Sequence, residues 1–188
     1  DNTPPTVSKE IGSPQYNGGE YLSSYTTITL NAYDTGEYVS GVKEIHYIIG
    51  YPDSTSAEFV ALGKTAQFTF TEEGEHTLEF WAIDNLDNEG EHTMQTHYVD
   101  DTGPTTTKEI GEPNYGEYVT TDSTIIISSS DTGAGVKEIH YIIGYPDSTS
   151  AEFVVPGDTV QFTFTEEGEH TLEFWAVDNF DNEGNHTM

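Results

Sequence analysis

The sequence predicts an all-β chain built from two tandem antiparallel β-sandwich domains, and three observations support this prediction. Apolar and polar residues alternate over short segments, which is the pattern of half-buried strands. No segment shows the periodicity of an amphipathic helix. Residues 42–94 also align with residues 136–188 without a gap and differ at seven positions. The repeat unit spans about 90 to 100 residues, the size of one small domain. We therefore predict domain 1 over residues 1–99 and domain 2 over residues 100–188.

Each unit is expected to contain seven short strands. Alternation and the Gly-, Pro- and Asp-rich turns between segments predict the strands of the first unit at 6–11, 25–34, 42–49, 57–62, 66–71, 76–84 and 93–99. Seven strands of this kind usually fold into two packed sheets, as in an Ig-like, fibronectin type III-like sandwich. The second unit stops early in its last strand. Truncation is the expected reason, and a strand supplied by another chain is the alternative.

The longest strand is the one that organises each unit. Residues 74–90, G-E-H-T-L-E-F-W-A-I-D-N-L-D-N-E-G, return at 168–184 as G-E-H-T-L-E-F-W-A-V-D-N-F-D-N-E-G. Alternation predicts that these residues of the strand point inward: His76, Leu78, Phe80, Ala82 and Asp84. Trp81 and Trp175 then point outward. The strand leads directly into a polar loop that is crowded with oxygen-bearing side chains.

The composition excludes several classes of partner. Asp and Glu number 34 against 5 Lys and Arg, which gives a formal charge of −29, and Arg and Cys are absent. Such a chain repels nucleic-acid phosphates and anionic membranes. The lack of Cys rules out disulfides and thiolate metal sites. No apolar run approaches the roughly 20 residues that cross a bilayer, so we expect no membrane insertion by this segment.

Three motifs carry a resemblance to a known class of repeats. They are G-V-K-E-I-H-Y-I-I-G, H-T-L-E-F-W-A-I-D-N-L-D-N-E-G and Y-V-D-D-T-G-P. Together they resemble the tandem Ig-like repeats of large bacterial and archaeal cell-surface proteins, over nearly the whole chain. The loop Leu86-Asp87-Asn88 departs from the usual A-G-N of these repeats by an added carboxylate. The resemblance implies an extracellular or cell-surface array with a structural or adhesive role, and it implies no particular ligand.

The acidic loops form the candidate metal site. In an Ig-like sandwich the second and sixth strands run in the same direction, so their following loops emerge at the same end, where the chain also enters the unit. The candidate ligands are Asp1, Asp34, Asp84, Asp87 and Asn88 for the first unit, and Asp100, Asp101, Asp131, Asp178, Asp181 and Asn182 for the second. Ca²⁺ takes 6–8 oxygen ligands in flexible geometry.

We therefore expect Ca²⁺ at each pole, where it would stiffen the joint between successive units. Two alternatives remain open at this point. Asp and Asn can simply cap turns through Asx-type hydrogen bonds, and a halophilic surface would also explain the acidity.

The remaining chemistry-bearing residues have plainer explanations. Trp81 and Trp175 could stack on sugars, cover a sheet edge or form an interface with another unit or chain. The seven His residues show no metal-ligand spacing on one element. No phosphate-binding, zinc-protease or nucleophile motif occurs, so we expect no enzyme.

The leading interpretation is a structural repeat segment of an extracellular surface array, that is, a stalk, sheath, filament or adhesin shaft. Its partners would be copies of itself or neighbouring repeats, because each unit of such an array needs only its neighbours. The alternative is a carbohydrate- or host-binding module of a surface adhesin or enzyme, whose partners would include surface glycans.

Overall fold

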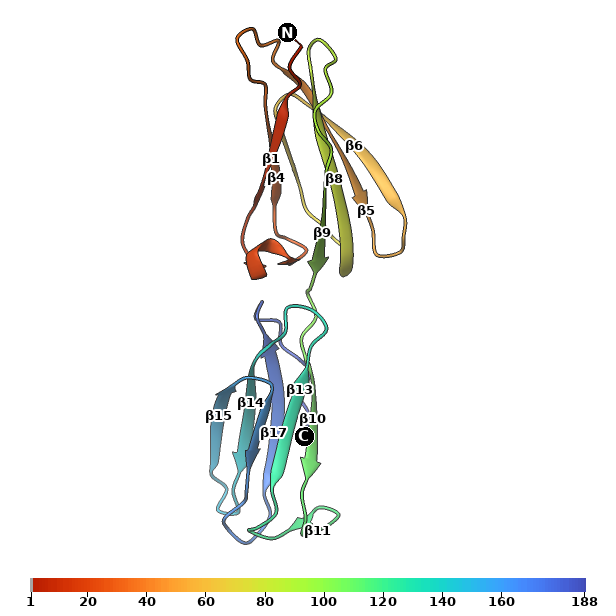
Figure 1. Cartoon of the computed structure of the whole chain (residues 1–188). Coiled ribbons are helices and arrows are strands. Elements are labelled where there is room, and N and C mark those ends of the chain that lie inside the picture. The colour runs from red at the N-terminus through yellow and green to blue at the C-terminus, as the bar shows by residue number, and fades with distance from the viewer. Residues whose placement is uncertain (1) are drawn as a thin grey trace. The chain divides into compact units, whose positions relative to one another are not determined.

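The computed structural model describes residues 2–188, and these residues fold almost entirely as β-strands (Figure 1). The chain divides into two compact units between Asp101 and Thr102. Within the described residues, the helical content is a single short 3-10 turn, η1 (Asn17–Gly19). No helix among them is long and apolar enough to cross a membrane.

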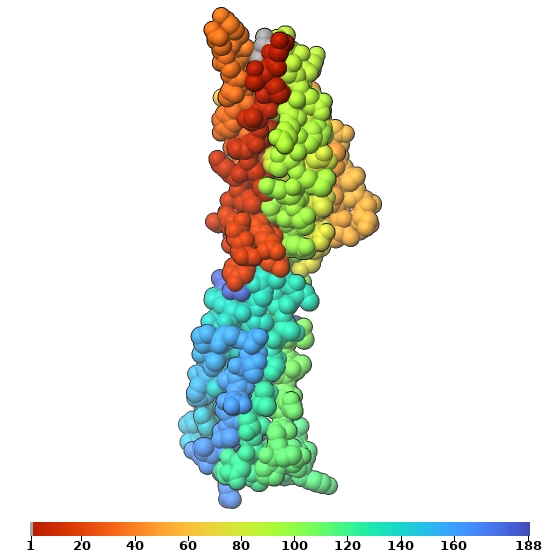
Figure 2. Space-filling model, in the orientation of Figure 1, coloured from red at the N-terminus to blue at the C-terminus, as the bar shows by residue number. Residues whose placement is uncertain are grey.

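The first unit is a sandwich of two sheets. Its strands are β1 (Thr6–Ile11), β2 (Gln15–Tyr16), β3 (Tyr21–Leu22), β4 (Ile28–Tyr33), β5 (Val42–Gly50), β6 (Ser56–Leu62), β7 (Thr65–Phe68), β8 (Gly74–Asp84) and β9 (Thr93–Val99). One sheet has the order β1-β4-β7 and the other the order β2-β3-β9-β8-β5-β6. All neighbours pair antiparallel except β3 and β9, which are parallel. The β5–β6 hairpin forms the lateral rim of this unit (Figure 2).

The second unit repeats this plan. Its strands are β10 (Thr105–Ile110), β11 (Asn114–Tyr115), β12 (Tyr118–Val119), β13 (Ile125–Ser130), β14 (Val136–Gly144), β15 (Ser150–Pro156), β16 (Thr159–Phe162) and β17 (Thr171–Asp178). Its two larger sheets have the orders β10-β13-β16 and β15-β14-β17, and β11 and β12 form a separate two-stranded sheet. Thr187 bridges Phe174 in the register that Thr93 and Phe80 have in the first unit.

Both units therefore have the predicted Ig-like, fibronectin type III-like sandwich, and the predicted fold class is confirmed. The alternation that was read from the sequence also selects the core of the first unit correctly. These inward residues are all at most 5% exposed: Ile28, Leu30, Ala32, Ile45, Ile49, Leu78, Phe80 and Ala82. Tyr47 packs between Phe59 and Phe68, with ring centroids at 5.1 and 4.6 Å. The two sheets thus enclose one apolar layer.

Some strand limits differ from the prediction. The strand expected at 25–34 begins at Ile28, because the Thr26 amide bonds back to the Ser23 carbonyl in a turn. The strand expected at 66–71 covers Thr65–Phe68, although Phe70 still points into the core and is 2% exposed. The two-residue strands β2 and β3 were not expected, since alternation cannot be recognised over two residues.

The division between the units also lies after Asp101 rather than after residue 99. The Asp100 amide donates to the Leu22 carbonyl at 2.9 Å, and the Asp101 carboxylate accepts the Ser24 amide at 3.1 Å. Both residues are therefore held by the first unit, which the sequence pattern did not indicate.

Leu78 of the first unit and the corresponding Leu172 of the second unit differ in burial. Leu78 in β8 is fully buried, and the Leu22 and Val99 side chains of β3 and β9 belong to the same cluster. Leu172 in β17, the counterpart of Leu78, is only partly buried. On the side where β9 covers β8, the pairing of β17 within residues 102–188 consists of isolated bridges, from Val177 to Glu183 and from Phe174 to Thr187.

This difference predicts unequal costs for one substitution. We expect Leu78→Ala to destabilise the first unit by about 3 kcal/mol, since it opens a cavity in a closed core. Leu172→Ala should cost the second unit only about 1 kcal/mol, because the side chain loses less buried area. Native-state hydrogen exchange resolved for β8 and β17 would measure both values. Equal costs would contradict the difference in burial between Leu78 and Leu172.

Candidate functional site

The candidate site is built around a buried aspartate at the end of the longest strand in each unit. In the first unit β8 ends at Asp84, which is 0% exposed. Its Oδ1 accepts the Leu86 and Asn88 amides, both at 2.8 Å, and its Oδ2 accepts the Asn88 side-chain amide at 2.7 Å. One carboxylate thereby holds the whole loop, in which Asp87 takes a left-handed φ of 61°.

The second unit repeats this arrangement at the end of β17. Asp178 is also 0% exposed. Its Oδ1 accepts the Phe180 and Asn182 amides at 2.8 Å, and its Oδ2 accepts the Asn182 side-chain amide at 2.8 Å. A second aspartate follows the neighbouring loop: the Asp131 Oδ2 accepts the Gly135 amide at 2.6 Å and the Gly133 amide at 3.1 Å.

In the first unit the corresponding aspartate is Asp34, which follows β4. Its Oδ2 accepts the Gly41 amide at 2.6 Å. Its Oδ1 is buried and has no hydrogen-bond partner among the described residues. This oxygen is available to a donor or a cation that approaches the pole.

The segment that leads into each unit passes over the same pole. A side chain at Gly184 would overlap the Pro104 carbonyl, and one at Gly90 would overlap the Pro5 carbonyl. Both glycines are therefore required for the leading segment to lie against the loop that follows the long strand. Within each unit, three segments meet at one pole, as the strand directions require.

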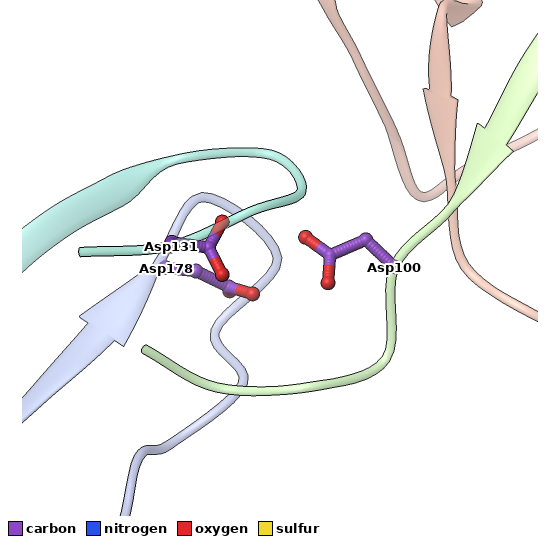
Figure 3. Close-up of side chains that lie close together, drawn as sticks. All are labelled: Asp100, Asp131 and Asp178. Carbon is purple, nitrogen blue, oxygen red and sulfur yellow. The ribbon is translucent and has the colours of Figure 1, made fainter. Parts of the chain in front are cut away.

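The second unit brings its two aspartates close together. Carboxylate oxygens of Asp131 and Asp178 lie within 4.8 Å of one another. Figure 3 shows the two side chains converging from the ends of β13 and β17, and it also draws Asp100, which belongs to the first unit. Two carboxylates at this separation repel when both are ionised.

The two buried aspartates differ in their electrostatics. Burial and the nearby Asp131 raise the pKa of Asp178 above its ordinary value of 3.8, although hydrogen bonds partly oppose this. Burial also acts to raise the pKa of Asp84, but hydrogen bonds outweigh it and hold the pKa at about 2. The Ser40 side chain also helps to lower the pKa of Asp84, and the second unit has Ala134 at this position.

The other predicted ligands lie elsewhere. Asp87 and Asp181 are about three-quarters exposed and pair with Lys43 at 2.8 Å and Lys137 at 2.6 Å. Asn88 and Asn182 direct their side-chain amides at the buried aspartates.

The linker aspartates are held within the first unit. Asp100 is 1% exposed, and the Asp101 carboxylate bonds to Ser24. Asp1 lies outside the described residues.

Trp81 points away from the core as expected, but it does not present an open ring. Its side chain is 7% exposed, since His92 stacks on it with centroids at 3.9 Å and His46 at 5.1 Å. Trp175 is covered in the same way by His186 and His140. Because histidines cover both tryptophans, neither ring offers an open face on which a sugar could stack.

Carboxylates surround the stack of His92, Trp81 and His46. The sequence did not predict this arrangement. The two ring nitrogens of His92 lie 2.8 Å from Glu79 and from Glu89, and these bonds raise its pKa. His46 likewise lies 3.3 Å from both Glu44 and Glu58. The available signal was the register that sets His46 beside Trp81 across β5 and β8. It becomes visible only once the strands are paired.

A shallow cavity of about 620 Å³ opens at the other edge of the first unit, between β1 and β9. Lys9 points into it and donates to the His97 Nε2 at 2.5 Å, while the His97 Nδ1 donates to the Gly19 carbonyl at 2.6 Å. Burial lowers the pKa of Lys9 to about 8. An inward-pointing charge at a sheet edge is a common protection against edge-to-edge pairing.

Comparison with known proteins gives little more than the strand arrangement. No family model and no curated protein matches the chain. Among solved structures, a two-domain fibronectin type III segment of chicken tenascin is 13% identical, with a TM-score of 0.39, over 98% of this chain and 96% of that one. The fibronectin(III)-like modules of Clostridium thermocellum CbhA are 16% identical, with a TM-score of 0.36, over 96% and 90%. Neither likeness assigns a ligand or a partner.

The histidine environments predict a split in titration. We expect His92 and His186 to titrate above pH 6.5, because paired glutamates stabilise their protonated forms. His76 and His97 should titrate below it, because burial disfavours their charged forms. The stability that the first pair contributes is present below pH 6.5 and is lost as the pH rises through their folded pKa. NMR titration would measure all four.

A matched substitution provides the control for this assignment. Glu79→Gln should lower the midpoint of His92 and leave His186 unchanged, and Glu173→Gln should do the reverse. Parallel shifts at both histidines would refute the local pairing.

The opposite pKa shifts of Asp84 and Asp178 predict that the two residues contribute oppositely to stability as the pH changes. The Asp84 carboxylate stabilises the fold above about pH 4, and this contribution is lost as the pH falls toward its folded pKa of about 2. For Asp178 the raised pKa means that stability is lost as the pH rises through that pKa. Asp84→Asn should therefore cost more stability at neutral pH than Asp178→Asn. Urea unfolding at pH 7 and at pH 3 tests this order, and the reverse order would exclude the difference between the poles.

Proposed function

We propose that this chain is a structural repeat segment of an extracellular surface array, in which Ca²⁺ binds at the aspartate poles and stiffens the joints between successive units. The observation that carries the proposal is the convergence of Asp131 and Asp178 at the pole through which the chain enters the second unit. The near-identity of the two units supports a repeat array, since length in such arrays comes from copy number.

The donor chemistry at the second pole suits a hard divalent cation. The Oδ1 of Asp178 accepts two amides and its Oδ2 accepts one side-chain amide, and a carboxylate oxygen can accept more than one bond. Burial, and to a smaller extent the neighbouring Asp131, raise the pKa of Asp178, so a cation would relieve both the cost of burying the charge and the repulsion within the pair. Carboxylate oxygens at flexible geometry are the ligands that Ca²⁺ prefers.

The linker can supply further oxygens. Residues 102–104 lead to β10, whose first residue Thr105 pairs with Ser130 beside Asp131. Asp100 and Asp101 come directly before this segment in the chain. Each residue spans at most about 3.6 Å, so residues 102–104 make a short connection. A cation bound to both the linker and the second unit would restrict the linker, which is the proposed stiffening.

The first pole is chemically different. The bonds from Asn88 and Leu86, with a contribution from Ser40, hold the pKa of Asp84 at about 2, so this carboxylate is ionised at neutral pH. The buried Asp34 Oδ1 remains available there. We therefore propose the tighter site at the second pole, with an affinity in the 10⁻⁴–10⁻³ M range of extracellular Ca²⁺ modules.

The carbohydrate- or host-binding alternative loses its main support, since both tryptophans are covered by histidines. No catalytic constellation is evident among residues 2–188, and the tandem sandwich fold is one that commonly serves as a structural module.

A melting experiment tests the cation. The melting temperature of the full chain should rise with millimolar Ca²⁺ and fall back with a chelator. With a Kd of 10⁻⁴–10⁻³ M, 1 mM Ca²⁺ stabilises the folded state by about 0.4 to 1.4 kcal/mol. Matched monovalent salt should not reproduce the shift. Equal melting in all three conditions would remove the site, and a shift with salt alone would indicate charge screening by a halophilic surface.

Variants locate the site. Asp131→Asn should abolish most of the Ca²⁺ shift, while Glu109→Gln, an exposed change of equal charge on β10, should leave it intact. Ala134→Ser copies the first unit and should weaken Ca²⁺ binding, because the new hydroxyl would bond to Asp178. A Ca²⁺ shift that survives Asp131→Asn would place the ion elsewhere.

A further inference from the structure

The strand β6 is an unprotected sheet edge in the first unit. It pairs with β5 on one side and is the last strand in the order β2-β3-β9-β8-β5-β6. Figure 1 shows it at the outer rim of the unit, and Figure 2 shows the same segment projecting sideways. An edge of this kind presents unpaired N–H and C=O groups that can pair with another strand.

The side chains of β6 do not block such pairing. The strand reads S-A-E-F-V-A-L, in which Glu58 is the single charged residue. Phe59 is 38% exposed, Val60 51% and Leu62 82%. In a chain with a net charge of −29, a seven-residue edge with one charge and three exposed apolar side chains is unusual.

Hydrogen bonds at both ends of β6 show which of its residues bond to β5 and which face outward. Gly63 donates to the Lys43 carbonyl at 2.7 Å, and Tyr51 donates to the Thr55 carbonyl at 2.8 Å. Main-chain groups alternate in direction along an antiparallel strand. Odd-numbered residues therefore bond to β5, and the outward N–H and C=O groups belong to Ser56, Glu58, Val60 and Leu62.

The strand is complementary to itself in the antiparallel register that is centred on Phe59. When two copies pair about Phe59, Glu58 faces Val60 and Ser56 faces Leu62, and all four outward residues form hydrogen-bonded pairs. No carboxylate faces a carboxylate. The register that is shifted to pair residue 58 with itself would set two Glu58 side chains opposite each other, which is unfavourable.

We propose that β6 is a docking edge for β6 of a second copy of this chain, in the antiparallel register centred on Phe59. The two six-stranded sheets would then form one continuous sheet. Phe59 stacks on Tyr47, which stacks on Phe68, and the partner's Phe59 would extend this aromatic row. This association is separate from the proposed Ca²⁺ joints, because β6 contains no candidate Ca²⁺ ligand.

The second unit provides an internal contrast. Its strand β15 reads S-A-E-F-V-V-P and has the same edge position. Pro156 replaces Leu62 at an outward position, so one N–H of that edge is missing. Proline on an edge strand is a recognised device against pairing. The repeat thus carries one open edge and one partly closed edge.

The association is expected to be weak and dependent on salt. A single strand pair buries less than the roughly 1,600 Å² of a standard stable interface. The charge of each copy adds repulsion, which salt screens beyond a Debye length of about 8 Å at 0.15 M. Dimers should therefore form reversibly at high protein concentration and increase with added NaCl.

Cysteine cross-linking of the full chain tests the register. The protein has no Cys, so Phe59→Cys introduces a single thiol. At a non-hydrogen-bonded antiparallel pair the Cα atoms lie about 4.5 Å apart, which is within disulfide range. We expect oxidised Phe59→Cys to form covalent dimers, and Val60→Cys and the matched Phe153→Cys to form far fewer. Equal cross-linking at Phe153→Cys or Val60→Cys would overturn the proposed partner or register.

Unmodified protein gives an independent measurement if Phe59→Cys fails to fold. The amides of Glu58 and Val60 should gain hydrogen-exchange protection as concentration rises, while that of Phe59 stays constant. Leu62→Pro should weaken self-association about tenfold, because each copy loses an outward N–H. A sedimentation profile that stays monomeric at millimolar concentration in high salt would overturn the proposal.

Discussion

The acceptance of loop amides by one buried carboxylate is the interaction on which the rest of each unit depends. Asp84 ends the central strand and converts a polar segment, which would otherwise be mobile, into a rigid turn. This turn forms the surface against which the segment at Pro5 lies, and Gly90 allows the close approach. Removing the carboxylate would thus affect the strand end, the loop and the chain entrance together.

The two units show how one nearby substitution changes the chemistry of an otherwise identical motif. Asp84 and Asp178 have the same loop bonds, but Ser40 supports the first, and the second has Ala134 and a close Asp131. The first is stable as an anion. The second is better suited to a partner cation, and it lies where the chain passes from one unit to the next. Duplication therefore does not make the two poles equivalent.

Within each unit, histidines on the sheet surface form hydrogen bonds with some of the acidic side chains. On the outer face of the larger sheet, histidines take the positions between glutamates that lysines or arginines would otherwise occupy. His92 bonds two glutamates and covers Trp81 at the same time. The stack buries an outward tryptophan without a second layer of protein. The charge on this face consequently depends on pH near the histidine pKa.

Much of the fold followed from the sequence alone. The alternation of residues 76–84 and the repeat determined the sandwich class, the inward residues and the convergence of acidic loops at one pole, because strand periodicity and strand direction are local properties. Only the tertiary structure decided which acidic residues approach each other. Asp87 and Asp181 form ion pairs with lysines, Asp100 and Asp101 belong to the first unit, and histidines cover the tryptophans. These outcomes depend on pairing register and on contacts between residues far apart in the chain, which no local pattern encodes.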